Sequence, residues 1–157
     1  MTGIDEVAFE EVDPGHADAQ ACLAAYYAVL DDRFDGGFDV AAALPLPLDE
    51  LRPPLGTFVL ARLGGRAVAC GGVKFHGADP AELKRMWVDA SVRGQGLGRR
   101  MLGALEDTAR RGGATAVQLE TNRNLPEAIA MYRTSGYDEV EPFNEEPYGH
   151  HWFQKDL

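Results

Sequence analysis

A glycine-rich turn between residues 86 and 101 carries the most specific chemical signal in the sequence. The stretch Arg93-Gly94-Gln95-Gly96-Leu97-Gly98 follows an apolar run and leads into a segment with helical periodicity. Glycines at alternate positions let consecutive backbone N–H groups point into one concavity, and the positive end of the following helix reinforces it. We therefore predict an anion-binding turn. Arg93, Arg99 and Arg100 add positive charge that suits a phosphate-bearing ligand.

Two common glycine-rich phosphate motifs do not fit this turn. A dinucleotide-binding fingerprint needs a third glycine at the position that Arg99 occupies. A P-loop needs a Gly-Lys-Ser/Thr sequence, and none follows here. The sequence therefore predicts neither a nicotinamide site nor a P-loop.

The charge distribution also favours an anionic ligand at this turn. The chain carries 15 basic and 25 acidic residues, a net charge of −10, which argues against non-specific binding to nucleic acid or to an anionic membrane. Residues 82–111 nevertheless hold seven basic and four acidic side chains. The alternative interpretation of this basic stretch is a solvated helix face.

Length and composition predict one globular domain over residues 1–157. With 45% hydrophobic and 25% charged residues, a chain of this size can fold without a disulfide or a structural metal. Cys22 and Cys70 match no metal-ligand pattern, so we interpret them as buried thiols in a reducing compartment. No apolar run reaches the ~18 residues of a membrane span, and the acidic N-terminus does not resemble a signal peptide. We expect a cytoplasmic protein that binds no metal, nucleic acid or membrane.

The elements that must position the turn alternate between strands and helices. Apolar or alternating runs predict strands at residues 6–12, 56–63, 66–75, 83–88, 116–120, around Val140 and at 150–156. Gly64-Gly65 predicts a hairpin between the second and third of these strands. This order predicts an α/β (α+β) fold around a mixed sheet, parallel across the later strand–helix–strand unit.

Three segments with helical periodicity separate these strands. The first begins after Asp13-Pro14, and the second follows the glycine turn as far as Arg111. The third has Pro126 in its first turn, Asn124 and Glu127 at capping-box spacing, and Gly136 as a left-handed C-cap. Residues 35–54 are rich in glycine and proline, so we expect them to wrap around the domain without a long helix.

Two motifs together resemble the GNAT family of acyltransferases. The stretch from Val88 to Gly98 is similar to the family's acetyl-CoA signature, in which Arg or Gln, two free positions, Gly, one free position and Gly or Ala hold the pyrophosphate. Residues 124–132, followed by Ser135-Gly136-Tyr137, are similar to its second marker. The tail at residues 143–153 resembles bacterial members of unassigned acceptor. The resemblance spans nearly the whole chain and implies a mixed sheet with helices on both faces and splayed fourth and fifth strands.

The resemblance also implies acetyl-CoA as the cosubstrate. Its pantetheine arm would pair with the backbone of the fourth strand, and backbone N–H groups of the glycine turn would hold its pyrophosphate. The thiol half would contact an asparagine before the last helix. The residues implied are Met86, Trp87, Val88, Arg93, Gly94, Gln95, Gly96, Leu97, Gly98, Arg99 and Asn124.

Transfer of an acetyl group to an amine needs a base and a proton donor. Tyr132 matches the position at which the family protonates the leaving thiolate, although a buried core phenol is the alternative. Glu82 stands where several members carry a catalytic glutamate, so we expect it to be the base, acting directly or through an ordered water. Glu120, His76 and His150 are further candidates.

A strand period of two would divide the side chains around Glu82 between the faces of the sheet. Residues 82, 84, 86 and 88 would share one face, and residues 83, 85 and 87 the other. The base matters because an alkyl amine of pKa near 10.4 is only about one part in a thousand neutral at pH 7.4. We predict direct attack of the amine on the thioester in a ternary complex, with the N–H of Val88 polarising the carbonyl.

The family's acceptor pocket lies between the first helix, the wrapping segment and the last hairpin. Here that pocket would comprise Phe34, Phe38, Phe143, Asn144, Tyr148, His150 and Trp152. The excess of acidic residues favours a small-molecule amine, although Arg33 could instead pair with an acceptor carboxylate. Two alternatives stay open: a protein or peptide N-acetyltransferase, and a noncatalytic acetyl-CoA-binding regulatory module. A monomer and a homodimer are equally compatible with the sequence.

Overall fold

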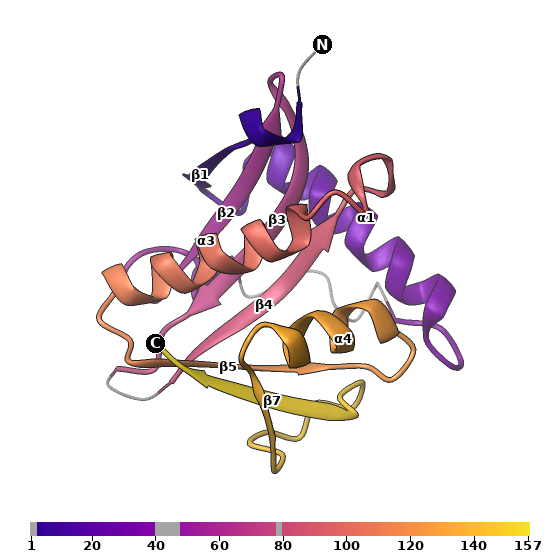
Figure 1. The fold of residues 1–157 in the computed structure, drawn as a ribbon, viewed down its shortest axis with the longest axis vertical. Coiled ribbons are helices and arrows are strands. Elements are labelled where there is room, and N and C mark those ends of the chain that lie inside the picture. Colours follow the sequence, from indigo (N-terminus) through magenta and orange to yellow (C-terminus); the bar gives the residue numbers. More distant parts are fainter. Residues whose placement is uncertain (1–2, 40–47, 78–79) are drawn as a thin grey trace.

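A seven-stranded mixed sheet forms the centre of the computed structural model, which describes residues 3–39, 48–77 and 80–157 (Figure 1). The strand order is β1-β2-β3-β4-β5-β7-β6. The strands are β1 (Ala8–Val12), β2 (Gly56–Leu63), β3 (Arg66–Lys74), β4 (Ala81–Val88), β5 (Ala116–Thr121), β6 (Asp138–Val140) and β7 (His151–Asp156). β4 and β5 run parallel, and the other neighbouring pairs are antiparallel. The predicted mixed sheet is confirmed.

Helices cover both faces of this sheet, as predicted. They are α1 (Ala17–Arg33), α3 (Leu97–Arg111) and α4 (Pro126–Thr134), with single 3₁₀ turns at Ile4–Glu6, Leu48–Leu51 and Ala90–Val92. Figure 1 shows α3 in front of the sheet and α1 behind it. The apolar stripe of α3 packs into one core together with Val59, whereas α1 packs into a second core together with Phe58. Each core therefore lies on its own side of the sheet.

Helix α1 begins later than the sequence suggested. Asp13 forms a turn instead, in which its side chain accepts a hydrogen bond from the Gly15 N–H at 2.7 Å and its carbonyl accepts one from the His16 N–H at 2.9 Å. The imidazole of His16 then caps the helix by accepting from the Asp18 N–H at 3.0 Å. An imidazole acceptor in place of the usual hydroxyl or carboxylate explains why the cap was missed.

The predicted capping box at the start of α4 is wrong. Leu125 is the N-cap and makes no side-chain cap hydrogen bond. Glu127 pairs with Arg33 at 2.7 Å, and the Asn124 side-chain amide donates to the Arg33 carbonyl at 2.9 Å. Both side chains thus tie α4 to the end of α1. The predicted C-cap is confirmed, since Gly136 has a φ of +90° just after the helix.

A bulge in β4 overturns the predicted alternation of its side chains. Cys70 of β3 faces Trp87 but Gly72 faces Lys84, so β4 carries one extra residue in this interval. Arg85 lies in this bulge and has a left-handed backbone conformation, with a φ of +56°. Met86 and Val88 consequently pack on the same side as Leu83, and Trp87 packs in the core of α1.

The parallel pairing of β4 with β5 ends almost as soon as it begins. Two residue pairs connect them, Ala81 with Val117 and Glu82 with Gln118. The strands then diverge, as Figure 1 shows, so the predicted splaying is confirmed. At the end of β4, the Asp89 N–H points towards β3, because it donates a hydrogen bond to the Val68 carbonyl at 2.8 Å. Because neighbouring residues of a strand direct their N–H groups to opposite edges, the N–H of Val88 points to the open side.

The wrapping segment expected at residues 35–54 is described at its two ends. Phe34 ends α1, residues 35–39 continue from it, and a 3₁₀ turn at Leu48–Leu51 leads towards β2. Residues 40–47 of this expectation lie outside the described residues. Across the described ranges, no helix is long and apolar enough to cross a membrane.

Two glycines provide a matched test of the packing of this fold. A Cβ at Gly56 would lie 2.0 Å from the Glu50 carbonyl oxygen and 2.5 Å from that of Val73, and neither backbone group can move aside cheaply. We expect Gly56→Ala to lower the free energy of unfolding by about 3 kcal/mol. Gly103 lies in α3 with open space at its Cβ, so Gly103→Ala should raise that free energy by about 0.5–1 kcal/mol. Urea unfolding measures both, and similar values for the two variants would contradict the packing described here.

Candidate active site

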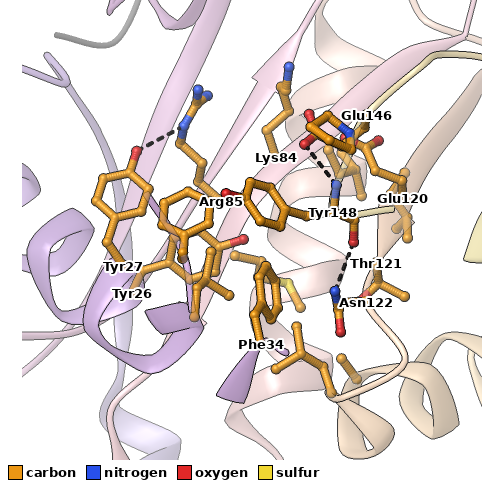
Figure 2. A pocket seen from close by; sticks show the side chains of 18 of the residues that line it. Tyr26, Tyr27, Phe34, Lys84, Arg85, Glu120, Thr121, Asn122, Glu146 and Tyr148 are labelled. Carbon is orange, nitrogen blue, oxygen red and sulfur yellow. Dashed lines mark hydrogen bonds between the residues drawn. The ribbon is translucent and has the colours of Figure 1, made fainter. Parts of the chain in front are cut away.

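A cavity of about 480 Å³ opens where β4 and β5 diverge (Figure 2). Side chains from α1, β4, β5, α4 and the segment before β7 surround it. The polar and aromatic members of its lining are Tyr26, Tyr27, Phe34, Phe38, Asp39, Lys84, Arg85, Glu120, Thr121, Asn122, Tyr132, Glu146 and Tyr148. The cavity thus combines aromatic walls with both signs of charge.

The aromatic wall contains three residues of the predicted acceptor pocket. Phe38 stacks on Tyr27 with ring centroids 5.5 Å apart. The Tyr148 ring lies 4.9 Å from that of Phe38 and 5.3 Å from that of Phe34. The Asp39 N–H also donates to the Tyr148 hydroxyl at 3.3 Å. Phe34 and Phe38 therefore meet Tyr148, which comes from a distant part of the chain.

The other four residues of that predicted pocket lie outside the cavity lining. They are Phe143, Asn144, His150 and Trp152. The Trp152 indole N–H donates to the Asn144 side-chain oxygen at 2.9 Å, and the His150 ring accepts from the Arg123 N–H at 3.1 Å. These contacts hold the segment before β7, which carries Tyr148 to the cavity.

Glu120 presents an unsatisfied carboxylate to the cavity. Its Oε2 atom is buried and has no hydrogen-bond partner. Burial raises the pKa of this carboxyl group, the Lys84 ammonium and a hydrogen bond with the Asn144 side chain partly oppose that rise, and the Glu82 carboxylate adds to it. A half-buried acid with one unpaired oxygen and a raised pKa is typical of a proton acceptor in a catalytic site.

Tyr132 lies in the same cavity as Glu120. It is 7% exposed, and its ring packs 5.7 Å from Tyr137 and 5.8 Å from Phe153. Burial, and then the Glu120 carboxylate, raise the pKa of the Tyr132 phenol. Its hydroxyl hydrogen-bonds to no other residue within the described ranges, and the phenol stays protonated at neutral pH. It can therefore donate to a ligand.

Glu82 does not line the cavity. Its carboxylate lies 2.7 Å from His76 Nε2 and 3.7 Å from Lys84 Nζ, beside the last residue pair that joins β4 to β5. Two of the predicted bases, Glu82 and His76, are thus engaged with each other. Of the predicted bases, Glu120 is the one in the cavity.

Asn122, which sequence reasoning missed, links three parts of the site. It is 4% exposed, its amide donates to the Tyr148 carbonyl at 2.9 Å, and its oxygen accepts from the Asn124 N–H at 2.8 Å. No motif marks it in the sequence, because its role depends on the distant Tyr148. The Asn124 side chain is bonded to the end of α1 through the Arg33 carbonyl.

The glycine turn has the open geometry that an anion needs. Gly94 and Gly96 have φ values of +78° and +82°, and nothing lies within 4 Å of either Cβ position. Gly96 is the N-cap of α3 and provides no side-chain acceptor. The N–H groups of the first helical turn, at Leu97, Gly98 and Arg99, therefore have no intrahelical acceptor.

Three arginines around this turn are bound to neutral groups. Arg93 donates to the Val88 carbonyl at 3.0 Å, and Arg99 to the Ser135 hydroxyl at 2.9 Å. Arg100 donates to the Ile4 carbonyl at 2.7 Å, which holds it against the N-terminal segment. Because no carboxylate within the described residues pairs with them, their positive charge is not cancelled by an ion pair.

A comparison with known protein families matches residues 23–137 to the Acetyltransferase (GNAT) family. The chain belongs to the GNAT family of acetyltransferases. It is 39% identical to the IAA acetyltransferase of Azospirillum brasilense over 105 residues, which cover 66% of this chain and 67% of that protein. It is also 37% identical to the N-alpha-acetyltransferase RimI of Mycobacterium tuberculosis. That match spans 94 residues, which are 58% of each chain.

A solved GNAT structure has the same fold. The GNAT family acetyltransferase from Elizabethkingia anophelis, a structure with acetyl-CoA bound, superposes with a TM-score of 0.69 over 98% of this chain and 99% of that one. Its sequence identity is 14%, so the likeness concerns the fold. This chain is therefore a GNAT acyltransferase in family and in architecture.

The partly desolvated carboxylate of Glu120 should make this GNAT domain less stable at high pH. A carboxyl group whose pKa is raised by folding binds its proton more tightly in the folded state, so stability falls as pH rises through the raised pKa. We expect Glu120→Gln to increase the free energy of unfolding by about 1 kcal/mol at pH 8, with the gain vanishing below pH ~4. The exposed Glu145→Gln is the control and should change little. Thermal unfolding at both pH values tests this, and a loss of stability in Glu120→Gln at pH 8 would contradict it.

Proposed function

We propose that this protein transfers the acetyl group of acetyl-CoA to an amino group of a small molecule bound in the cavity. The observation that carries the proposal is that Glu120 and Tyr132 line one cavity beside the open edge of β4. Glu120 can take a proton from an amine, and Tyr132 can give a proton to a leaving thiolate. Acetyl-CoA-dependent transfer is the chemistry of the family.

The residues of the glycine turn and of β4 fit acetyl-CoA. The N–H groups of residues 94–99 would hold its pyrophosphate, and Arg93 and Arg99 would add charge. The backbone of Met86, Trp87 and Val88 would pair with the pantetheine amides, because β5 leaves that edge of β4 open. When bound, acetyl-CoA supplies the acetyl thioester that is attacked.

Glu120 would act as the general base. An amine reaches the cavity mainly as ammonium and cannot attack until it loses a proton. The Glu120 carboxylate takes that proton, and its raised pKa brings it closer to the pH at which the enzyme works. The amine nitrogen then forms a bond to the acetyl carbon, whose carbonyl oxygen accepts from the N–H of Val88.

Tyr132 would complete the transfer as the general acid. As the bond between carbon and sulfur breaks, the electron pair stays with sulfur, and the phenol donates its proton there. Burial keeps the phenol protonated until that moment. The amine nitrogen then loses its second proton, which returns to the Tyr132 phenolate, and the proton held by Glu120 passes to solvent, so both groups are restored.

A small-molecule acceptor is favoured by the walls of the cavity. Phe34, Phe38 and Tyr148 close one side of a space of about 480 Å³, which suits a compact ligand. The named relatives include both an IAA acetyltransferase and an enzyme that acts as an N-alpha-acetyltransferase. A peptide acceptor is therefore the second candidate, and a screen that includes both amines and peptides distinguishes them.

Removing the Tyr132 hydroxyl tests the proposed acid. We expect Tyr132→Phe to reduce turnover at least tenfold while acetyl-CoA binding is retained, because one positioned proton donor contributes about 10²–10⁴-fold. Free thiol release across amines, amino acids and peptides measures turnover, and calorimetry measures binding. Tyr137→Phe is the matched control, since its hydroxyl bonds to Glu106 at 2.7 Å outside the cavity. Unchanged turnover in Tyr132→Phe would remove this residue from the mechanism.

Two glutamine variants identify the base. We expect Glu120→Gln to slow acetylation about 100-fold at pH 7, with a smaller loss at pH 9.5 where more of the amine is already neutral. Glu82→Gln removes the carboxylate that contacts His76. It should change kcat/KM by the same factor at both pH values. The pH profiles of kcat/KM decide between them. A loss in Glu82→Gln that shrinks at high pH, with Glu120→Gln active, would reverse the assignment.

A further inference from the structure

We propose that the acceptor carries a carboxylate as well as its amine, and that Arg85 binds this carboxylate. The proposal rests on the proposed function, because it concerns the acceptor of that same cavity. It defines the substrate class as amino acids or similar amino carboxylates with an apolar or aromatic body.

The pairing of the arginines singles out Arg85. Eight of the twelve arginines form ion pairs with carboxylates: Arg33, Arg52, Arg62, Arg66, Arg110, Arg111, Arg123 and Arg133. Within the described ranges, Arg93, Arg99, Arg100 and Arg85 have no such partner. The first three belong to the glycine turn and its helix. Arg85 is the member of this group that lines the cavity.

The guanidinium of Arg85 is held in position but not satisfied. Its Nε atom donates to the Tyr27 hydroxyl at 3.2 Å, and its Nη1 atom is buried with no hydrogen-bond partner among the residues that the structure describes. A partly buried guanidinium without a counter-ion is costly, and pairing with a carboxylate removes much of that cost. Arg33, predicted for this task, is already bound to Glu127 at 2.7 and 3.0 Å.

The bulge directs Arg85 to the side of α1. Arg85 has a φ of +56°, an uncommon conformation for a residue other than glycine, and bulges next to active sites re-aim side chains. Figure 2 shows the Arg85 side chain reaching the Tyr27 hydroxyl, beside the ring of Tyr26. The cost of this backbone conformation is consistent with a functional position for the side chain.

The two ends of the cavity carry opposite charge. Arg85 lies with Tyr26 and Tyr27 at the α1 end, whereas Glu120 comes from β5 and lies on the opposite side in Figure 2, near Glu146. Aromatic rings line the space between them, including those of Phe34 and Tyr148. An amino carboxylate with an apolar body matches this order, with its carboxylate at Arg85 and its amine at Glu120.

Pairs of acceptors with a free or an esterified carboxyl group test the proposal. The probes are L-phenylalanine, L-tyrosine, L-tryptophan and L-leucine, each compared with its methyl ester, and thiol release from acetyl-CoA gives kcat/KM. We expect the wild-type protein to prefer at least one free acid over its ester by tenfold or more. The ester amines are the less basic, so amine ionisation alone would favour the esters.

Variants connect that preference to Arg85. We expect Arg85→Gln to lower the acid-to-ester ratio of kcat/KM at least tenfold, mainly through KM, and Arg85→Lys to restore part of it. Arg33→Gln, whose side chain is paired outside the cavity, should keep the wild-type ratio. Tyr27→Phe removes the hydroxyl that holds Arg85 and should lower the ratio less than Arg85→Gln does. It also serves as the second variant if Arg85→Gln does not fold.

The outcomes separate this proposal from the proposed function. If the wild-type protein acetylates no small amine or amino acid, the proposed function fails, and acetylation of peptides alone would favour the second candidate. If it acetylates amines but uses acids and esters equally, the proposed function stands and the role of Arg85 is overturned. A preference for acids that both Arg85→Gln and Tyr27→Phe retain also overturns it.

Discussion

The early separation of β4 from β5 is the constraint on which the rest of the structure depends. Two residue pairs hold the strands together, after which each strand follows a different neighbour. A continuous ladder would satisfy the backbone of β4 and leave no space between the strands. Instead, no strand within residues 3–39, 48–77 and 80–157 pairs with that edge of β4 from Leu83 onwards, and the N–H of Val88 points into the gap. The cavity, its acid and its phenol all lie along this gap.

The bulge at Arg85 adds a second consequence to this separation. One extra residue in β4 moves Met86 and Val88 to the face of α3 and turns Arg85 towards α1. The same strand thereby offers its backbone edge to the gap and directs a cationic side chain towards α1. In a regular strand that keeps Leu83 on the face of α3, Arg85 would point to that same face, because side chains alternate with a period of two.

The sequence predicted the elements better than it predicted the contacts between them. Hydrophobic periodicity and glycine positions located the strands, α3 and the turn at residues 93–98, because these features depend on neighbours in the chain. The bulge was missed because no local pattern marks Arg85, and the alternation assumed for Glu82 and Met86 failed with it. Glu120 was named but ranked below Glu82, since its surroundings depend on β4 and on the segment before β7, which are distant from it in the chain. Such long-range arrangements are visible in the fold and not in residue spacing.

The two separate cores have a consequence for how this domain can diversify. The glycine turn, α3 and Tyr132 belong with one core, whereas α1 and its aromatic side chains belong with the other. Mutations that reshape the α1 wall need not disturb the packing around the glycine turn. Evolution can therefore exchange the molecule being modified while the donor of the modifying group stays the same.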